Sequence, residues 1–374
     1  MIHILHVIDS LDLGGAQTAL LNLIQPCDCA VFHHEVAAMH GRGMFADAFE
    51  SAGIPVHSLS ARRCPPAYVW RLPALLRRGS FDVVHCHLFG ANWVAKPIAF
   101  FCGCRVIYNH DQCNDAFRNE SRLVTWIDAQ MNRFSTRILP VSQSISRYLQ
   151  QSENIPASKI SYLPNSVDLE SFHPASLAER TRAREIFGLP AGATVIGGVG
   201  RLVPQKQFET FVAAATELHR RRPDWIFVLF GSGPDEQALR AQAASLGSAF
   251  RFAGTSRDRA AIYHAIDVQV LPSRFEGMPM TILEGMASGL PVVATRVDGV
   301  LEMATDRKHV LLVNPGDVPA LVQAISEAAE PTTAMKHMCL RAQAHVEKAY
   351  NSKTLSDQLH AYYREDVAVA KIIS

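Results

Sequence analysis

The sequence predicts an α/β protein built from two Rossmann-like, doubly wound parallel-sheet domains that face each other across a cleft. First, its 374 residues are too many for one ordinary core and suit two. Second, short apolar strands alternate with helical stretches, which is typical of parallel sheets covered by helices. Third, this alternation stops at a polar, proline-containing stretch, 163–174, and then starts again. We therefore expect a first domain over 1–175 and a second over 176–350.

The first half opens with a clear unit of strand, loop and helix. Residues 1–8 are apolar and partly β-branched, Gly14 and Gly15 follow in a loop, and a helical apolar pattern runs through 19–24. The further strands expected in this half lie at 36–40, 81–87, 105–110 and 137–142.

The second half predicts six short strands with helices between them. They lie within 194–202, 225–234, 249–254, 267–273, 291–295 and 309–313. Substrates of doubly wound domains bind at the carboxyl ends of the strands. The candidate residues that follow predicted strands are Gly14, Gly15, His85, His87, His110, Arg201, Gly231, Gly233 and Glu276.

Composition and charge exclude several classes of protein. Hydrophobic residues make up 48% and charged residues 19%, which predicts two full cores and no long disordered stretch. The formal net charge of +1 gives no sign of a nucleic-acid partner. The N-terminal residues lack the pattern of a signal peptide, and no apolar run is long enough to span a bilayer, so we expect a cytoplasmic protein.

The eight cysteines give no sign of a redox or zinc motif. Cys27 and Cys29 form one Cys-x-Cys pair and Cys102 and Cys104 another, and neither has a two-residue spacer. We interpret them as small apolar residues in a reducing compartment.

The most informative segment is 273–292, which holds Glu276 and Glu284. Pro279 suits the first position of a helix that runs to about Ser288 and ends at Gly289. The free backbone amides of its first turn form an anion site suited to a diphosphate. These amides belong to Met280 and Thr281, and Gly277 and Met278 complete the expected donor-binding segment.

The two carboxylates have different expected partners. Glu284, about one turn inside the helix, could accept hydrogen bonds from ribose hydroxyls, and Glu276 could point at the group that the diphosphate carries. The alternative is that Glu276 is solvated and Glu284 is an ordinary helix-surface residue.

A second segment, 198–206, supplies positive charge. Gly198 and Gly200 let the backbone approach a ligand at the end of a strand, and Arg201 and Lys206 place two cations across a short loop. A departing phosphate needs such cations because negative charge builds up on it. The alternative is that both cations are only solvated.

Together these motifs resemble family four of the retaining glycosyltransferases, which have the GT-B fold. The resemblance covers most of the chain in the right order. It rests on Glu276-x7-Glu284, the Gly-Arg-Leu loop with Lys206, residues 164–168 (Pro-Asn-Ser-Val-Asp), residues 231–234 (Gly-Ser-Gly-Pro) and Gly14-Gly15.

The resemblance implies a role for each matching residue. Arg201 and Lys206 correspond to the cations that bind the diphosphate, Glu284 to the ribose ligand and Glu276 to the carboxylate near the donor sugar. Gly15 matches the loop that approaches the donor phosphates as the cleft closes. Three further matches are His110, near the reacting centre, and Gly254 and Thr255, which would hold the nucleobase.

The chain departs from the family at three places. Met278-Pro279 stands where Phe-Gly is frequent, so one amide donor is lost. Gln207 follows Lys206 where glycine is usual, and Asn165-Ser166 replaces the commoner Asn-Gly.

The resemblance also implies a reaction. A hexosyl group would pass, with retention at the anomeric carbon, from a nucleoside diphosphate sugar, above all a UDP-sugar, to a hydroxyl of a glycan, lipid-linked sugar or small molecule. GDP-mannose remains an alternative donor. No metal or cofactor is expected, and a C-terminal helix within 351–374 would return to the first domain.

His85 and His87 alternate on one strand, so their side chains share a face. A metal hydrolase could use such a pair, but no third ligand follows at short range. The alternative is a packing or acceptor-side role.

The stretch from Arg62 to Arg78 holds five arginines and no acidic residue, interleaved with aromatic and leucine side chains. This pattern suits peripheral contact with the inner face of an anionic membrane or a charged acceptor. The alternative is a helix with its apolar side in the core.

Other functions remain open because a fold hosts several reactions. An epimerase, a phosphorylase or a noncatalytic nucleotide-sugar-binding protein could share this scaffold. A phosphorylase would need a lysine for pyridoxal phosphate, and the loops offer no obvious candidate. A dehydrogenase is disfavoured because Gly14-Gly15 does not match Gly-x-Gly-x-x-Gly.

Overall fold

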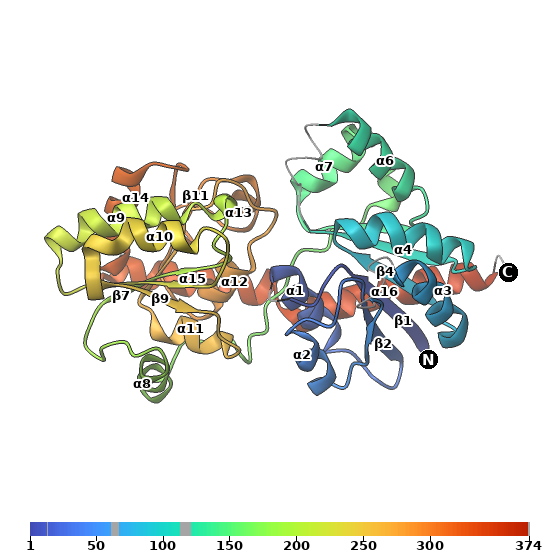
Figure 1. The fold of residues 1–374 in the computed structure, drawn as a ribbon, viewed down its shortest axis with the longest axis horizontal. Coiled ribbons are helices and arrows are strands. Elements are labelled where there is room, and N and C mark those ends of the chain that lie inside the picture. The colour runs from blue at the N-terminus through green and yellow to red at the C-terminus, as the bar shows by residue number, and fades with distance from the viewer. Residues whose placement is uncertain (13, 61–66, 113–120, 373–374) are drawn as a thin grey trace. The chain divides into compact units, whose positions relative to one another are not determined.

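A computed structural model describes residues 1–12, 14–60, 67–112 and 121–372. The chain forms two compact units (Figure 1). Unit 1 contains Met1–Ser166 together with the last helix, α16 (Ser352–Ile372), and unit 2 contains Val167–Asn351. The first border therefore lies between Ser166 and Val167, somewhat before the expected position between 175 and 176.

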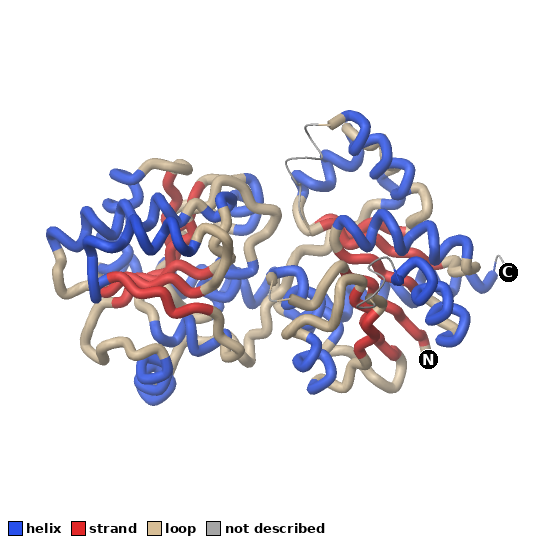
Figure 2. The backbone as a smooth tube through the Cα atoms, viewed as in Figure 1, coloured by secondary structure: helices blue, strands red, loops and turns tan. Residues whose placement is uncertain are grey.

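Unit 1 is a six-stranded parallel sheet in the order β3-β2-β1-β4-β5-β6, with helices on both faces (Figure 2). Its strands are β1 (Ile2–Ile8), β2 (Phe32–Ala38), β3 (Val56–Ser58), β4 (Val83–His87), β5 (Val106–Asp111) and β6 (Arg137–Pro140). Its helices before α16 are α1 (Gly15–Ile24), α2 (Ala46–Ser51), α3 (Tyr68–Gly79), α4 (Phe89–Phe101), α6 (Arg122–Asn132), α7 (Gln143–Gln151) and the short η2 (Ala157–Lys159). The sequence missed β3, because three residues carry too little periodicity to be recognised.

Alternation along the strands divides the core of unit 1 between two faces. Ile4 and Ile8 of β1 point to one face, where they join a cluster with Leu359 and Tyr363 of α16. Leu5, on the other face, joins a cluster with residues of α3 and α4. Helix α16 therefore completes the core of unit 1, although it is more than 180 residues away from the rest of that unit along the chain.

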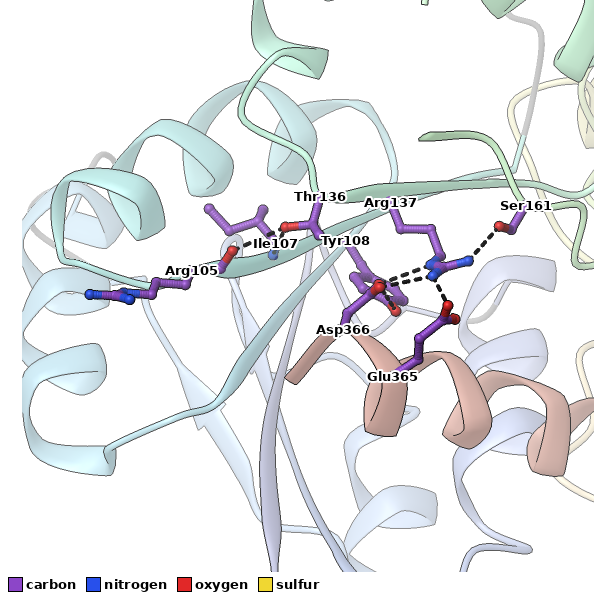
Figure 3. Close-up of polar contacts among 8 residues, drawn as sticks. All are labelled: Arg105, Ile107, Tyr108, Thr136, Arg137, Ser161, Glu365 and Asp366. Atoms are coloured by element: carbon purple, nitrogen blue, oxygen red, sulfur yellow. Dashed lines mark hydrogen bonds and ion pairs between the residues drawn. The ribbon is translucent and has the colours of Figure 1, made fainter. Parts of the chain in front are cut away.

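Polar contacts also fix α16 to the sheet (Figure 3). Arg137 of β6 donates to Asp366 Oδ1 at 2.8 Å and to Asp366 Oδ2 at 2.9 Å, and it also donates to Glu365 and Ser161. The hydroxyl of Tyr108 donates to the same Asp366. Both members of the Arg137–Asp366 pair are mostly buried, so the ion pair is shielded from solvent.

Unit 2 repeats the plan with a sheet in the order β12-β11-β10-β7-β8-β9, again parallel. Its strands are β7 (Val195–Val199), β8 (Ile226–Phe230), β9 (Phe250–Gly254), β10 (Val268–Leu271), β11 (Val292–Thr295) and β12 (Leu311–Val313). Its helices are α8 (Leu177–Ile186), α9 (Phe208–Arg221), α10 (Glu236–Ala243), α11 (Arg259–Ala265), α12 (Met280–Ala287), α13 (Asp298–Met303), α14 (Val318–Ala329) and α15 (Thr333–Ala349), with the short η3 (Pro204–Lys206) and η4 (Ala244–Ala249). All six strands expected in this half are present, and the predicted α/β class with two parallel sheets is confirmed.

Across the described part of the chain, none of the helices combines the length and the apolar character needed to span a bilayer.

Candidate donor-binding site

Four neighbouring strand ends in unit 2 carry most of the predicted site. Strands β10, β7, β8 and β9 lie side by side and are parallel, so the segments that follow them meet at one edge of the sheet. These segments begin at Gly200 after β7, Gly231 after β8, Thr255 after β9 and Pro272 after β10.

The loops after β7 and β10 bring Lys206 and Glu276 together. The Nζ of Lys206 lies 2.5 Å from Oε1 of Glu276, and the hydroxyl of Ser273 donates to the same oxygen at 2.5 Å. Both charged side chains are largely buried, with exposed fractions of 13% for Lys206 and 7% for Glu276. This burial contradicts the alternative that Glu276 is only solvated. Its charge is compensated by Lys206 inside the protein.

Backbone contacts keep these two loops in place. The side-chain amide of Gln205 donates to the carbonyl of Phe275 at 3.0 Å, and the amide of Arg274 donates to the carbonyl of Gln205 at 2.8 Å. The hydroxyl of Thr295, on β11, donates to the carbonyl of Ser273 at 2.6 Å. The lysine and the carboxylate are thus held by rigid elements on both sides.

Glycines after β8 allow this loop to pack closely against the backbone of the loop after β7. A Cβ on Gly231 (φ +140°) would lie 1.9 Å from the carbonyl oxygen of Gly200, and one on Gly233 would lie 2.2 Å from that of Leu202. A Cβ on Gly198 would meet Leu229, which occupies the space that we expected a ligand to approach.

Gln207 explains why glycine is usual after the lysine. Its backbone is left-handed, with φ 51° and ψ 40°, immediately before α9. A side chain in this conformation costs about 1–2 kcal/mol, and glycine avoids most of that cost.

The start of α12 differs by one residue from the prediction. Pro279 has an extended ψ of 114° and lies just before the helix, which begins at Met280. The helix ends at Ala287, and Gly289 follows with a φ of +71°, as expected for a helix stop. The first-turn amides of Met280 and Thr281 make no hydrogen bond to another backbone group in the described residues, so they can bind an anion. The side chains of Met278 and Met280 are buried in the core, which leaves only their backbone to face a ligand.

Glu284 is fully buried, which contradicts the helix-surface alternative. Arg259 of α11 donates to its Oε1, and the hydroxyl of Tyr263 donates to its Oε2 at 2.5 Å. Burial raises the pKa of Glu284, and the charge of Arg259 opposes that shift. Sequence reasoning missed both partners because they lie 21 and 25 residues earlier in the chain, with no local pattern that links them to Glu284.

The remaining predicted residues of unit 2 are more exposed to solvent than Glu284. Arg201 is exposed, and within the described ranges its side chain makes no hydrogen bond or ion pair. Gly254 has a φ of +68°, and its carbonyl accepts from the amide of Gly231 at 2.7 Å. Thr255, the next residue, is exposed.

Gly299, near the start of α13, is a site residue that the sequence did not indicate. A Cβ at this position would lie 2.2 Å from the carbonyl oxygen of Gly277 and 2.5 Å from that of Glu276. The turn that carries Glu276 therefore rests directly on the backbone of Gly299. The signal available in the sequence was a glycine in the first turn of the helix that follows strand β11.

Two of the residues to which the resemblance assigns a role belong to unit 1. Gly15 is the first residue of α1, and His110 is fully buried near the end of β5. Burial lowers the pKa of His110 to about 4, so the ring is neutral at physiological pH.

Comparisons with known proteins identify the family of this chain. A family model described as Glycosyltransferase Family 4 matches residues 13–171, and one described as Glycosyl transferases group 1 matches residues 193–330. A D-inositol 3-phosphate glycosyltransferase of Corynebacterium urealyticum is 31% identical over 309 residues, covering 76% of this chain and 72% of that relative. This chain belongs to glycosyltransferase family 4. The glycosyltransferase takes a sugar from a nucleotide-sugar donor, and the predicted family is confirmed.

Another relative and a solved structure also match most of this chain. A UDP-Gal:alpha-D-GlcNAc-diphosphoundecaprenol alpha-1,3-galactosyltransferase of Escherichia coli is 29% identical over 260 residues, which are 67% of each chain. Among solved structures, Anabaena HepE in complex with UDP-glucose superposes with a TM-score of 0.86 at 22% identity, covering 98% of this chain and 100% of HepE. That likeness supports the GT-B fold.

Proposed function

We propose that this glycosyltransferase transfers a hexosyl group from a UDP-sugar to an acceptor hydroxyl with retention at the anomeric carbon, in the synthesis of a polysaccharide, glycolipid or other glycoconjugate. The observation that carries the proposal is the buried pair of Lys206 and Glu276 in the loops before α9 and α12, together with first-turn amides of α12 that lack a backbone partner among the described residues. UDP as the nucleotide is supported by the galactosyltransferase relative, which is named for UDP-Gal, and by the complexes of HepE with UDP and UDP-glucose.

Positive charge for the leaving diphosphate would come from side chains and the helix. Lys206 has three N–H donors, and Glu276 occupies one of them, so the others can reach phosphate oxygens. Arg201 and the amides of Met280 and Thr281 would add to this charge. Gly277 and Met278 would contribute through their backbone. This arrangement needs no metal at the diphosphate.

Glu284 would bind the ribose by exchanging partners. Its carboxylate is fully buried and bonded to Arg259, whose side chain is 24% exposed. Ribose hydroxyls would displace Arg259 from Oε1 while Tyr263 keeps Oε2, and Gly254 and Thr255 would hold the base. The burial of Glu284 makes it a strong acceptor for such hydroxyls, because hydrogen bonds to a charged group in a dry site are stronger.

In the proposed reaction the bond between the anomeric carbon and the diphosphate oxygen breaks while the acceptor oxygen attacks from the same face. The acceptor proton passes to the leaving diphosphate oxygen, and the sugar passes through an oxocarbenium-like transition state. Glu276 would orient the sugar. From unit 1, His110 and Gly15 are assigned to the reacting centre and the donor phosphates by family resemblance, and their roles stay predictions.

The test begins with a panel of nucleoside diphosphate sugars in a nucleotide-release assay, followed by identification of the product anomer by NMR. With the best donor, Lys206→Ala and Glu284→Ala should each lower kcat/KM at least tenfold, about 1.4 kcal/mol of transition-state stabilisation. Arg274→Ala is the matched control, because this exposed cation of the loop that carries Glu276 forms an ion pair only with partly exposed Glu209 among the described residues. Wild-type rates in both folded site variants, or an inverted product, would refute the assignment.

We also propose that the enzyme touches the inner face of an anionic membrane through residues 62–78, of which 62–66 lie outside the described residues. Helix α3 is amphipathic: Leu72 and Leu76 are buried, while Trp70, Arg71, Arg77 and Arg78 are exposed. An exposed tryptophan beside arginines suits a lipid interface. The protein should sediment with anionic liposomes at low salt and not with zwitterionic ones, and a double variant R77E/R78E should lose this binding. Absence of sedimentation at low salt refutes the contact.

A further inference from the structure

One face of the sheet in unit 1 carries a group of buried histidines. Alternation along β1, β2, β4 and β5 directs their side chains to the face that α16 covers, and α16 adds one histidine of its own. All are at most 4% exposed: His6, His34, His85, His87, His110 and His360. The proposed transfer reaction uses only His110 among them.

Hydrogen bonds fix the tautomers of four of these rings. The carbonyl of Ser356 can only accept, so Nδ1 of His360, 2.6 Å away, carries a proton and Nε2 of His360 is a lone pair. That lone pair accepts from Nε2 of His34 at 2.8 Å, and Nδ1 of His34 then accepts from Nε2 of His6 at 2.9 Å. Nδ1 of His6 is therefore a lone pair, and it faces Nε2 of His87 at 3.0 Å.

A second proton on His6 or His34 would leave two N–H groups facing each other, so the hydrogen bonds keep the rings of this chain neutral. Nδ1 of His6 offers a lone pair, and a shift of the His87 proton from Nε2 to Nδ1 would place a second lone pair beside it.

His85 offers a third lone pair at the same place. Its Nδ1 lies 2.5 Å from the hydroxyl of Tyr363, which can accept the Nδ1 proton. Its Nε2 is buried and, within the described residues, has no hydrogen-bond partner. The ligand atoms of His6, His85 and His87 all lie within 4.8 Å of one another.

We infer that His6, His85 and His87 form a binding site for one divalent transition-metal ion of the zinc class. The 3.0 Å between Nδ1 of His6 and Nε2 of His87 matches the separation of about 3.0–3.4 Å for two nitrogens that share one ion at about 2.0–2.1 Å. The ligand atom of His85 lies within 4.8 Å of the other two, so its ring would have to move toward them to share the ion. A His-x-His pair on one strand with a third histidine from elsewhere is a ligand set that zinc uses.

The hydrogen bonds around His6 and His85 suit histidines that bind a metal ion through their other nitrogen. A metal-bound histidine usually donates its other N–H to a fixed acceptor, and this N–H goes to His34 from His6 and to Tyr363 from His85. The proton of His87 would move from Nε2 to Nδ1, which has no hydrogen-bond partner among the described residues, so the three rings themselves would release no net proton. Three imidazoles without a carboxylate favour zinc, cobalt, nickel or copper over magnesium or calcium. Water or hydroxide would complete the coordination.

This site is separate from the proposed donor-binding residues of unit 2, although the ring of His110, which the resemblance assigns to the reacting centre, stacks on the ring of His85 at 5.5 Å between centroids. Its ligands come from β1 and β4 of unit 1, whereas the proposed donor cations and carboxylates belong to unit 2. The ion would tie the two central strands together beneath α16. The sequence concealed the site, because the third ligand precedes the His-x-His pair by about 80 residues and reaches it only through the pairing of β1 with β4.

The test uses tag-free, full-length protein that has been freed of metal with EDTA. Cobalt(II) is titrated as a spectroscopic probe for zinc, and zinc is counted by mass spectrometry after dialysis. We expect one ion per chain, ligand-field absorption in the visible range, and a higher Tm with zinc. His85→Gln and His87→Gln should weaken binding at least tenfold, whereas His337→Gln, an exposed histidine of α15, should not change it.

A readout on the wild-type protein keeps the test valid if the variants fail to fold. X-ray absorption of the zinc form should show imidazole nitrogens and no sulfur neighbour. A sulfur neighbour would assign the ion to the nearby group of Cys27, His34 and His360 and would overturn the inference. Absence of stoichiometric uptake by the wild-type protein, or unchanged affinity in folded His85→Gln, would overturn it as well.

Discussion

The contact between Lys206 and Glu276 gives the carboxylate a role that can be separated from nucleotide binding. Glu276→Gln keeps an acceptor for Ser273 and for Lys206 but removes the negative charge. We expect kcat for sugar transfer to fall at least tenfold, about 1.4 kcal/mol, because the sugar loses an oriented carboxylate. Affinity for free UDP, measured by calorimetry, should change much less, since UDP carries no sugar. Equal losses in both measurements would place Glu276 on the nucleotide instead.

Gly299 tests how strictly the turn before α12 must be placed. Alanine favours a helix more than glycine does, so Gly299→Ala would ordinarily stabilise α13. Here the added Cβ would lie 2.2 Å from the carbonyl oxygen of Gly277, and backbone atoms cannot move aside cheaply. We expect a folded variant whose kcat/KM falls at least tenfold, because displacement of reacting groups by about 1 Å can cost a hundredfold.

The matched control for that variant is Gly192→Ala, whose Cβ would meet no atom within 4 Å. Transfer kinetics of the two alanine variants, with circular dichroism to confirm folding, check the prediction. Full activity in Gly299→Ala would mean that the turn can shift without loss.

At the scale of elements, the docking of α16 on its sheet should be sensitive to acid. Burial lowers the pKa of His34 to about 3 and of His360 to about 4, against 6.5 for an ordinary histidine. Between these values the unfolded chain binds protons that the folded chain does not. The stability from the neutral rings is therefore complete above about pH 6.5 and is lost as the pH falls toward about 4, by up to about 1.4 kcal/mol per pH unit for each ring.

Urea unfolding of the metal-free protein, followed by circular dichroism near pH 7 and near pH 5, measures this effect. The free energy of unfolding should be clearly lower at the acid pH. His360→Gln should reduce that difference because one titrating ring is removed, and exposed His337→Gln should leave it unchanged. A pH-independent free energy of unfolding would contradict the neutral state of the rings.

At the scale of the whole molecule, local patterns predicted most of the strands and the loops that carry the candidate site residues, but not the contacts between distant segments. Buried parallel strands such as β7 and β8 are continuous apolar runs, so they can be recognised in the sequence. Glu284 could be named as a candidate because it follows a recognisable helix start, whereas no local pattern indicated its partner Arg259. Pairings of this kind depend on sheet order, which brings together residues with no common period along the chain.

The two units should also differ in how their folding tolerates truncation of the chain. Unit 2 is one continuous segment, 167–351, with its own cluster of buried residues from β7 to α15. Unit 1 is completed only by α16, which buries Leu355, Leu359, Tyr363 and Val367 in its core. Fully burying four such side chains contributes about 6–12 kcal/mol, comparable to the whole stability of a domain, about 5–15 kcal/mol.

A fragment of residues 167–351 should therefore fold cooperatively and bind UDP without transferring sugar, whereas a chain that ends at residue 351 should lose the cooperative unfolding of unit 1. Arg137 and Tyr108 would also lose their common partner Asp366 in the shortened chain, which leaves buried polar groups unsatisfied. Calorimetric unfolding and UDP titration of both proteins measure these outcomes. If the chain lacking α16 kept both unfolding transitions, α16 would be an accessory rather than a structural part of unit 1. If the 167–351 fragment folded but failed to bind UDP, unit 2 would not be sufficient to bind the nucleotide.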